Sequence, residues 1–320
     1  MTHSSFKKLS KSSLPLHTDY HEVKGIDDID DIPGNLVQSQ LVLTQSEKKG
    51  DPGFVCVKGI PCVDCPTDYS PLSVERLRIF GPYAKMVPAP AGAVILWLGT
   101  TIHANCKAGH TLQMHEKSDL THISMKNATR EQIVTSLNTA GYCVIVDVIN
   151  QETIDEYIGG MTSDILSAQV VEGASPKGQA GCAIWKGLGL PCTQNAQVRR
   201  LTPAVHEIFQ MIYGTPELTV SADSFAAQYA SVDGNYVVSP ETILRAVQFI
   251  CWAPAALLDE KTAKAKIKSF EKGQSSCHNP LKVQGTVSGR HMSDRHGQWA
   301  TVPFQGTLQE TRNALMGQWA

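Results

Sequence analysis

Three residues of the chain could together hold a metal ion. His17 and Asp19 stand two positions apart, and in an extended segment they point to the same side because strand side chains alternate. His103 comes much later, just after the apolar run 94–98. Two histidines and one carboxylate form the facial triad that leaves coordination positions of a non-haem Fe(II) open. An HxD triplet alone, or a histidine at a strand end alone, is common, so the prediction depends on all three residues.

The segments around these residues have the pattern of short strands between turns. The expected strands are residues 36–43, 53–57, 76–80, 93–98, 142–146 and 244–252. Helices are expected to begin near residues 130, 150 and 203, with a capping box at Thr129 and Gln132 opening the first and Gly141 ending it. A lysine-rich helix with a solvated face is expected at 260–272, and the tail after Asn279 shows no pattern. His110, His115 and His122 are expected on the surface.

Composition restricts the class of protein. The chain has 320 residues, of which 42% are hydrophobic and 18% charged, as in ordinary globular proteins with a sizeable core. No apolar run reaches the length of a membrane span, and a net charge of −2 provides no electrostatic footprint for nucleic acid. The first residues do not have the pattern of a secretory signal, so a cytoplasmic location is expected. A mostly β first third combined with helices from elsewhere predicts one α+β domain built on a sandwich or barrel of short strands.

Several segments together resemble a known family. They are the triplet 17–19, the strand 38–43, the segment 51–59, and the segment 90–97 followed by His103. In this order and spacing they look like the metal-centre segments of the phytanoyl-CoA dioxygenase-like Fe(II)/2-oxoglutarate-dependent oxygenases. The resemblance implies a double-stranded β-helix, also called a jelly roll or cupin-like core, with flanking helices. It also implies that His17, Asp19 and His103 hold the iron.

The order of the remaining segments differs from that family. Residues 131–148, and then 187–191 together with 199–225, resemble material that the family places before its HxD strand, so the chain looks circularly permuted. The whole chain, 1–320, would then be a single oxygenase domain. Its parts would be the metal-binding strands at 14–109, a helical support region with the first strands at 126–228, and a strand and C-terminal helix at 239–280.

The permutation also accounts for the cosubstrate arginine that the resemblance implies. The family binds the distal carboxylate of 2-oxoglutarate through an arginine on a strand shortly after the second histidine, and this chain has no arginine between His103 and Arg130. Removing residues 110–238 as the displaced half brings Arg245 to the expected distance. Asn105, Gln38 and Trp97 are further candidates for the wall around the cosubstrate.

The resemblance implies an oxidoreductase that uses Fe(II), 2-oxoglutarate and O2. Such an enzyme would hydroxylate a small organic molecule and release succinate and CO2, without nucleic-acid or membrane partners. Tyr20 and residues 58–62 depart from the family pattern on the substrate side, so the substrate class stays open. Two alternatives remain: a cupin-like metal enzyme that does not use 2-oxoglutarate, and a non-catalytic β-helix that binds a partner or a small molecule.

Overall fold

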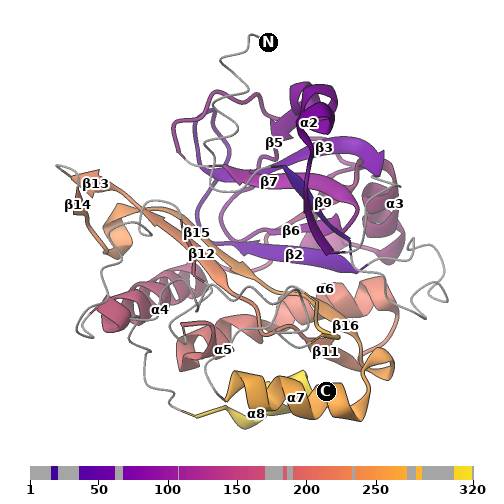
Figure 1. Ribbon diagram of the computed structural model, residues 1–320, viewed down its shortest axis with the longest axis vertical. Coiled ribbons are helices and arrows are strands. Elements are labelled where there is room, and N and C mark those ends of the chain that lie inside the picture. The colour runs from indigo at the N-terminus through magenta and orange to yellow at the C-terminus, as the bar shows by residue number, and fades with distance from the viewer. Residues whose placement is uncertain are drawn as a thin grey trace. The chain divides into compact units, whose positions relative to one another are not determined.

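The structure is a computed structural model of the whole chain (Figure 1). It describes residues 16–20, 36–61, 68–106, 108–169, 183–185, 190–232, 235–271, 279–282 and 306–318. These residues form a mixed α+β structure that divides into two compact units. Unit 1 contains the described residues of 1–37 and 44–148, and unit 2 contains 38–43 and the described residues from 149 onward. No helix among the described residues is long and apolar enough to cross a membrane.

A five-stranded antiparallel sheet forms one layer of unit 1. Its strand order is β4-β1-β7-β3-β5. The strands are β1 (His17–Tyr20), β3 (Gly53–Pro61), β4 (Asp68–Pro71), β5 (Ala84–Met86) and β7 (Thr101–Cys106). Strand β7 lies between β1 and β3, and its His103 is directly opposite both His17 and Cys56. The expected extended form of the 17–19 triplet is therefore confirmed.

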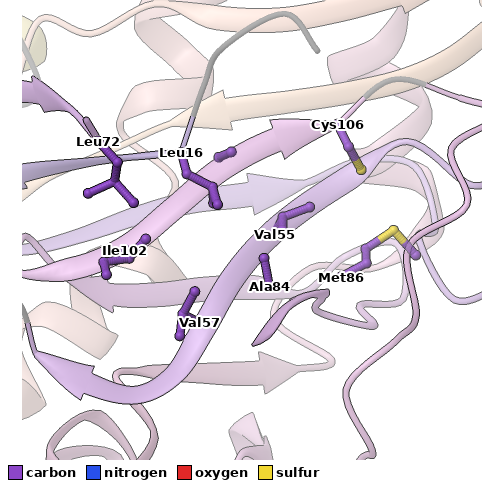
Figure 2. Close-up of a cluster of buried hydrophobic side chains, with 9 residues drawn as sticks. Leu16, Val55, Val57, Leu72, Ala84, Met86, Ile102 and Cys106 are labelled. Carbon is purple, nitrogen blue, oxygen red and sulfur yellow. The ribbon is translucent and has the colours of Figure 1, made fainter. Parts of the chain in front are cut away.

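The two faces of this sheet carry different side chains. One face holds a buried apolar cluster of Leu16, Val55, Val57, Leu72, Ala84, Met86, Ile102, Ala104 and Cys106, most of which are labelled in Figure 2. Leu16 and Ile102 in this cluster are the chain neighbours of His17 and His103. Because side chains alternate along a strand, both histidines point to the face opposite this cluster.

A second group of strands in unit 1 consists of β6 (Val94–Leu98), β9 (Tyr142–Val146) and β8 (His122–Ser124). Strand β9 pairs antiparallel with β6 and parallel with β8. Helix α3 (Arg130–Ala140) precedes β9, and its predicted signals are confirmed. Thr129 and Gln132 form the capping box, and Gly141 ends the helix in a left-handed conformation with φ of 79°.

Unit 2 contains a second run of paired strands and most of the helices. Strand β15 (Ile243–Phe249) pairs antiparallel with β2 (Val37–Val42) on one side and β12 (Phe225–Tyr229) on the other. The remaining strands are β10 (Ala183–Trp185), β11 (Leu218–Val220), β13 (Ser231–Val232), β14 (Asn235–Tyr236) and β16 (Trp252–Pro254). The helices are α4 (Gln151–Gln169), α5 (Gln194–Arg200), α6 (Pro203–Tyr213), α7 (Glu260–Phe270) and α8 (Gln309–Leu315). Figure 1 shows α4 and α5 beside the long strands β12 and β15.

Helix α5 covers one face of the β12–β15 strand pair through Arg199. The Arg199 guanidinium donates a hydrogen bond to Gln248 of β15 and lies over the ring of Phe225 in β12. It also forms an ion pair with Asp164 of α4 at 3.2 Å. Phe225 and Gln248 are directly opposite each other, so both point toward the helices. By alternation Arg245 and Val247 point to the opposite face.

Several predictions of local structure were wrong. Residues 76–80 are not a strand but the end of helix α2 (Val74–Phe80), because the Ser73 hydroxyl accepts the Arg76 N–H and so caps an N-terminus there. The strand expected at 244–252 ends at Phe249, after which the chain changes partner and β16 pairs with β11. The patternless tail contains α8. Helix α7 ends at Phe270, earlier than expected. Its Lys266 does not belong to a solvated face, because it is buried and donates to Thr219 and Val220.

Short 3-10 turns complete the described structure. They are η2 (Gly81–Tyr83), η3 (Met125–Asn127), η5 (Leu190–Cys192), η6 (Pro240–Thr242) and η7 (Ala255–Leu257).

Candidate metal centre

The three predicted ligands lie together in unit 1. The ligand atoms of His17, Asp19 and His103 are all within 4.8 Å of one another. Asp19 Oδ2 is 3.4 Å from His103 Nε2 and 3.8 Å from His17 Nε2, and the two imidazole rings have centroids 4.3 Å apart. Two imidazole nitrogens and a carboxylate oxygen thus converge on a volume of the size that one metal ion occupies. This group could bind a metal ion as a 2-His-1-carboxylate triad.

The strand register explains the convergence. His17 lies directly opposite His103 across the β1–β7 pair, and opposite residues in an antiparallel pair share a face. Asp19 is two positions along β1 and so returns to that face, while its backbone N–H donates to the Gly99 carbonyl at 3.0 Å. This bond ties β1 to the turn before β7. The two-residue spacing of His17 and Asp19 therefore puts both side chains on the face of the sheet that carries His103.

Burial and one backbone bond prepare the site for a cation. The exposed fractions of His17, Asp19 and His103 are 4%, 5% and 2%. The Nδ1–H of His103 donates to the Thr101 carbonyl at 2.9 Å, which fixes the tautomer and leaves the Nε2 lone pair for a metal. A divalent cation among these three atoms would balance the charge of the buried carboxylate. The donor set and its burial fit a resident metal.

Aromatic rings surround His103. The Phe54 ring stacks on its imidazole with centroids 5.5 Å apart, and the Trp97 ring lies at 5.4 Å. Phe54 and Trp97 also contact each other, at 4.7 Å. The indole Nε1–H of Trp97 is buried and has no hydrogen-bond partner among the described residues. Asn105, which is 7% exposed, shares the face of His103 two positions along β7.

The sequence singled out Trp97 and Asn105, whose cosubstrate role stays a prediction, but not Phe54. A usable signal was present: in a strand over 53–57 that packs beside the His103 strand, alternation separates Phe54 and Cys56 from Val55 and Val57. The register, Phe54 opposite Asn105 and Cys56 opposite His103, could not be read from the sequence. It depends on pairing between segments about fifty residues apart.

The expectation that His115 lies on the surface was wrong. His115 is 9% exposed, its Nε2 is 3.1 Å from the Cys56 carbonyl oxygen, and its ring lies beside that of Tyr142. Burial lowers the pKa of His115 and raises that of the Cys56 thiol, so both groups favour their neutral forms. The segment preceding β8 is held in place by this contact and by Met86 O, which accepts the His115 N–H.

The other two predicted residues belong to unit 2. Arg245 on β15 is 7% exposed, and its Nη2–H donates to Gln40 Oε1 at 3.4 Å. Gln38 on β2 is fully buried, and neither its amide nitrogen nor its amide oxygen has a partner among the described residues. The structure thus joins the triad with Trp97 and Asn105 in one unit, and Gln38 with Arg245 in the other.

Comparison with models of protein families, with curated proteins and with solved structures finds no match.

Proposed function

We propose that the protein is an Fe(II)/2-oxoglutarate-dependent oxygenase that hydroxylates a small organic molecule. The observation that carries the proposal is the buried group of His17, Asp19 and His103, whose ligand atoms lie within 4.8 Å of one another. Two imidazoles and one carboxylate are typical of non-haem Fe(II) oxygenases, because three protein ligands leave positions for a chelating cosubstrate and O2. The fold would be a circularly permuted double-stranded β-helix.

The protein's own residues would have separate tasks. Asp19 supplies the anionic ligand, and the Thr101 carbonyl holds His103 with its Nε2 ready to coordinate. Phe54 and Trp97 exclude water from the His103 side. Fe(II) with 2-oxoglutarate and O2 would supply an oxidant strong enough for an unactivated C–H bond, with succinate and CO2 as coproducts.

The choice of 2-oxoglutarate rests on Arg245 together with the family resemblance. The Arg245 side chain is buried on the face of β15 that points away from α5. A buried guanidinium is a strong bidentate partner for a carboxylate. We propose that it binds the distal carboxylate of 2-oxoglutarate, which is the role that the resemblance implies for it.

Succinate formation tests this function. The protein is incubated with Fe(II), 2-oxoglutarate and O2, alone and with panels of lipids, small metabolites and amino acids. We expect succinate from the wild-type protein, a rise with at least one panel member, and none from Asp19→Ala. If the wild-type protein binds iron but forms no succinate under any condition, the proposal is wrong and the metal enzyme without 2-oxoglutarate is favoured.

The fluorescence of Trp97 should report metal binding. A paramagnetic ion such as Co(II) at the triad would lie next to the indole, since the Trp97 and His103 ring centroids are 5.4 Å apart. Co(II) should therefore quench part of the tryptophan emission, whereas diamagnetic Zn(II) should not quench it. Trp97→Phe should remove most of the Co(II)-dependent drop, and Asp19→Asn should prevent it. A drop of equal size in Trp97→Phe would place the metal elsewhere.

A further inference from the structure

The thiol of Cys56 is buried beside the candidate metal centre. Cys56 lies directly opposite His103 in the β3–β7 pair. Opposite residues of an antiparallel pair share a face, and their Cβ atoms are about 5 Å apart. The two residues are 0% and 2% exposed. The thiol is therefore next to a metal ligand, on the face of the five-stranded sheet that carries the triad and inside unit 1.

Burial protects this thiol from oxidants in solution. Peroxide reacts with the thiolate form of cysteine, and burial raises the pKa of Cys56 far above its usual range. An oxidant made at the triad would differ in two ways. It would arise inside the protein, and an oxidant strong enough for an unactivated C–H bond does not need a thiolate, because an S–H bond is weaker than such a C–H bond. Cys56 is thus exposed to the metal centre alone.

His115 is placed to hold an oxidised form of Cys56. Its Nε2 is 3.1 Å from the Cys56 carbonyl oxygen and 3.6 Å from the Cys56 Sγ. A carbonyl oxygen only accepts hydrogen bonds, so the Nε2 of His115 carries the hydrogen. An oxygen atom added to the sulfur would come within reach of this donor. A sulfenic acid at Cys56 would therefore have a hydrogen bond waiting for it in the interior.

Cys106 is a matched thiol on the same sheet. It lies on β7, three positions after His103, and alternation places its side chain on the opposite face. There it belongs to the apolar cluster, as Figure 2 shows. It is 5% exposed, so it is no better protected from solution than Cys56. An oxidant from solution would not prefer Cys56 over Cys106, whereas an oxidant from the triad would.

We propose that Cys56 is a site of self-oxidation that stops turnover when the primary substrate is absent. The proposal rests on the proposed function. The Cys56 thiol, 2-oxoglutarate and O2 would give a Cys56 sulfenic acid, succinate and CO2. One oxygen atom of O2 replaces the S–H bond by S–O and O–H bonds, and the other enters the new carboxylate of succinate. The sulfur and 2-oxoglutarate each lose two electrons, and O2 accepts four.

The added oxygen would act on the metal centre through packing. Cys56 is fully buried, so an extra atom on its sulfur has to displace neighbours, and His103 is the residue opposite it. Displacing a ligand should weaken iron binding by about ten- to a hundredfold, the usual effect of disturbing the surroundings of a metal ligand. A sulfenic acid is reduced by added thiols, so the inactivation should be reversible.

Chemical trapping locates the oxidation. The full-length protein is incubated in air with Fe(II) and 2-oxoglutarate but no primary substrate, then unfolded in dimedone, which labels sulfenic acids, and mapped by mass spectrometry. We expect label on Cys56 and little on Cys106. Zn(II) in place of Fe(II), or hydrogen peroxide added to the metal-free protein, should leave Cys56 unlabelled. Equal labelling of the two cysteines, or no label on Cys56 while succinate forms, would overturn the proposal.

Time courses of succinate formation without primary substrate test the consequence. The wild-type protein should slow with time, bind iron more weakly after incubation, and recover both properties on addition of dithiothreitol. Cys56→Ala should continue at a steady rate, and Cys106→Ala should slow like the wild type. Slowing of Cys56→Ala at the wild-type rate would refute the role of Cys56 alone. If the wild-type protein forms no succinate under any condition, the proposed function fails first.

Discussion

Replacing Asp19 by alanine should abolish iron binding. The wild-type protein should take up about one Fe(II) per chain in an anaerobic titration, because the three ligand atoms within 4.8 Å can meet one ion. Asp19→Ala leaves two imidazoles without the carboxylate that neutralises the cation, in a site that is almost fully buried. His17→Ala should have the same effect, since two ligands of one ion in a buried site hold it far more weakly than three.

Thr18→Val is the matched control for both variants. Thr18 lies between the two ligands on β1, is fully buried, and points to the other face of the strand. Its hydroxyl has no partner among the described residues, so the substitution removes no bond seen there and keeps the shape. Iron binding should stay as in the wild type. Undiminished binding in both His17→Ala and Asp19→Ala would refute the assignment of the triad.

Replacing Arg245 by alanine should weaken 2-oxoglutarate binding by about 30-fold to several thousand-fold. That range corresponds to about 2–5 kcal/mol, the usual cost of removing one partner of a buried, hydrogen-bonded charge pair. Iron binding should be retained, since Arg245 is not a metal ligand. Arg245→Lys should restore affinity only in part, because an ammonium group lacks the planar fork that pairs with both carboxylate oxygens. Anaerobic calorimetry with Fe(II) present measures both effects.

Leu244→Ala is the control on the same strand. Leu244 is 40% exposed and neighbours Arg245, so its truncation tests whether any change in β15 disturbs binding. We expect 2-oxoglutarate affinity close to that of the wild type. Normal affinity in Arg245→Ala would remove the cosubstrate role of this arginine, and with it the main support for the permuted β-helix.

Part of the metal triad was predictable from the sequence because its geometry follows from simple periodicity. Two ligands of the same strand must share a face when they are two residues apart, and His17 and Asp19 do. His103 joins them because β1 pairs with β7 in the register that puts His17 opposite His103, and periodicity does not give that register. Helix α3 was equally readable, since its capping box and its terminal glycine are local signals.

The remaining features depend on pairing between distant segments. The contact between Arg245 and Gln40 joins residues 205 positions apart, and the stacking of Phe54 on His103 requires a particular register of β3 and β7. The burial of His115 depends on the Cys56 carbonyl, which no local pattern around residue 115 indicates. Helix α2 was misread because the run 76–80 is too short for periodicity to separate helix from strand, and the Ser73 cap was overlooked.

The most direct test of the central claim is an anaerobic visible spectrum of the wild-type protein, first with Fe(II) and then with 2-oxoglutarate added. Chelation of the triad-bound iron by the cosubstrate should produce a weak charge-transfer band that saturates at about one 2-oxoglutarate per chain. The band should be absent in Asp19→Ala and should need much more 2-oxoglutarate in Arg245→Ala. A wild-type protein that binds Fe(II) but develops no band at any concentration of 2-oxoglutarate would contradict the account.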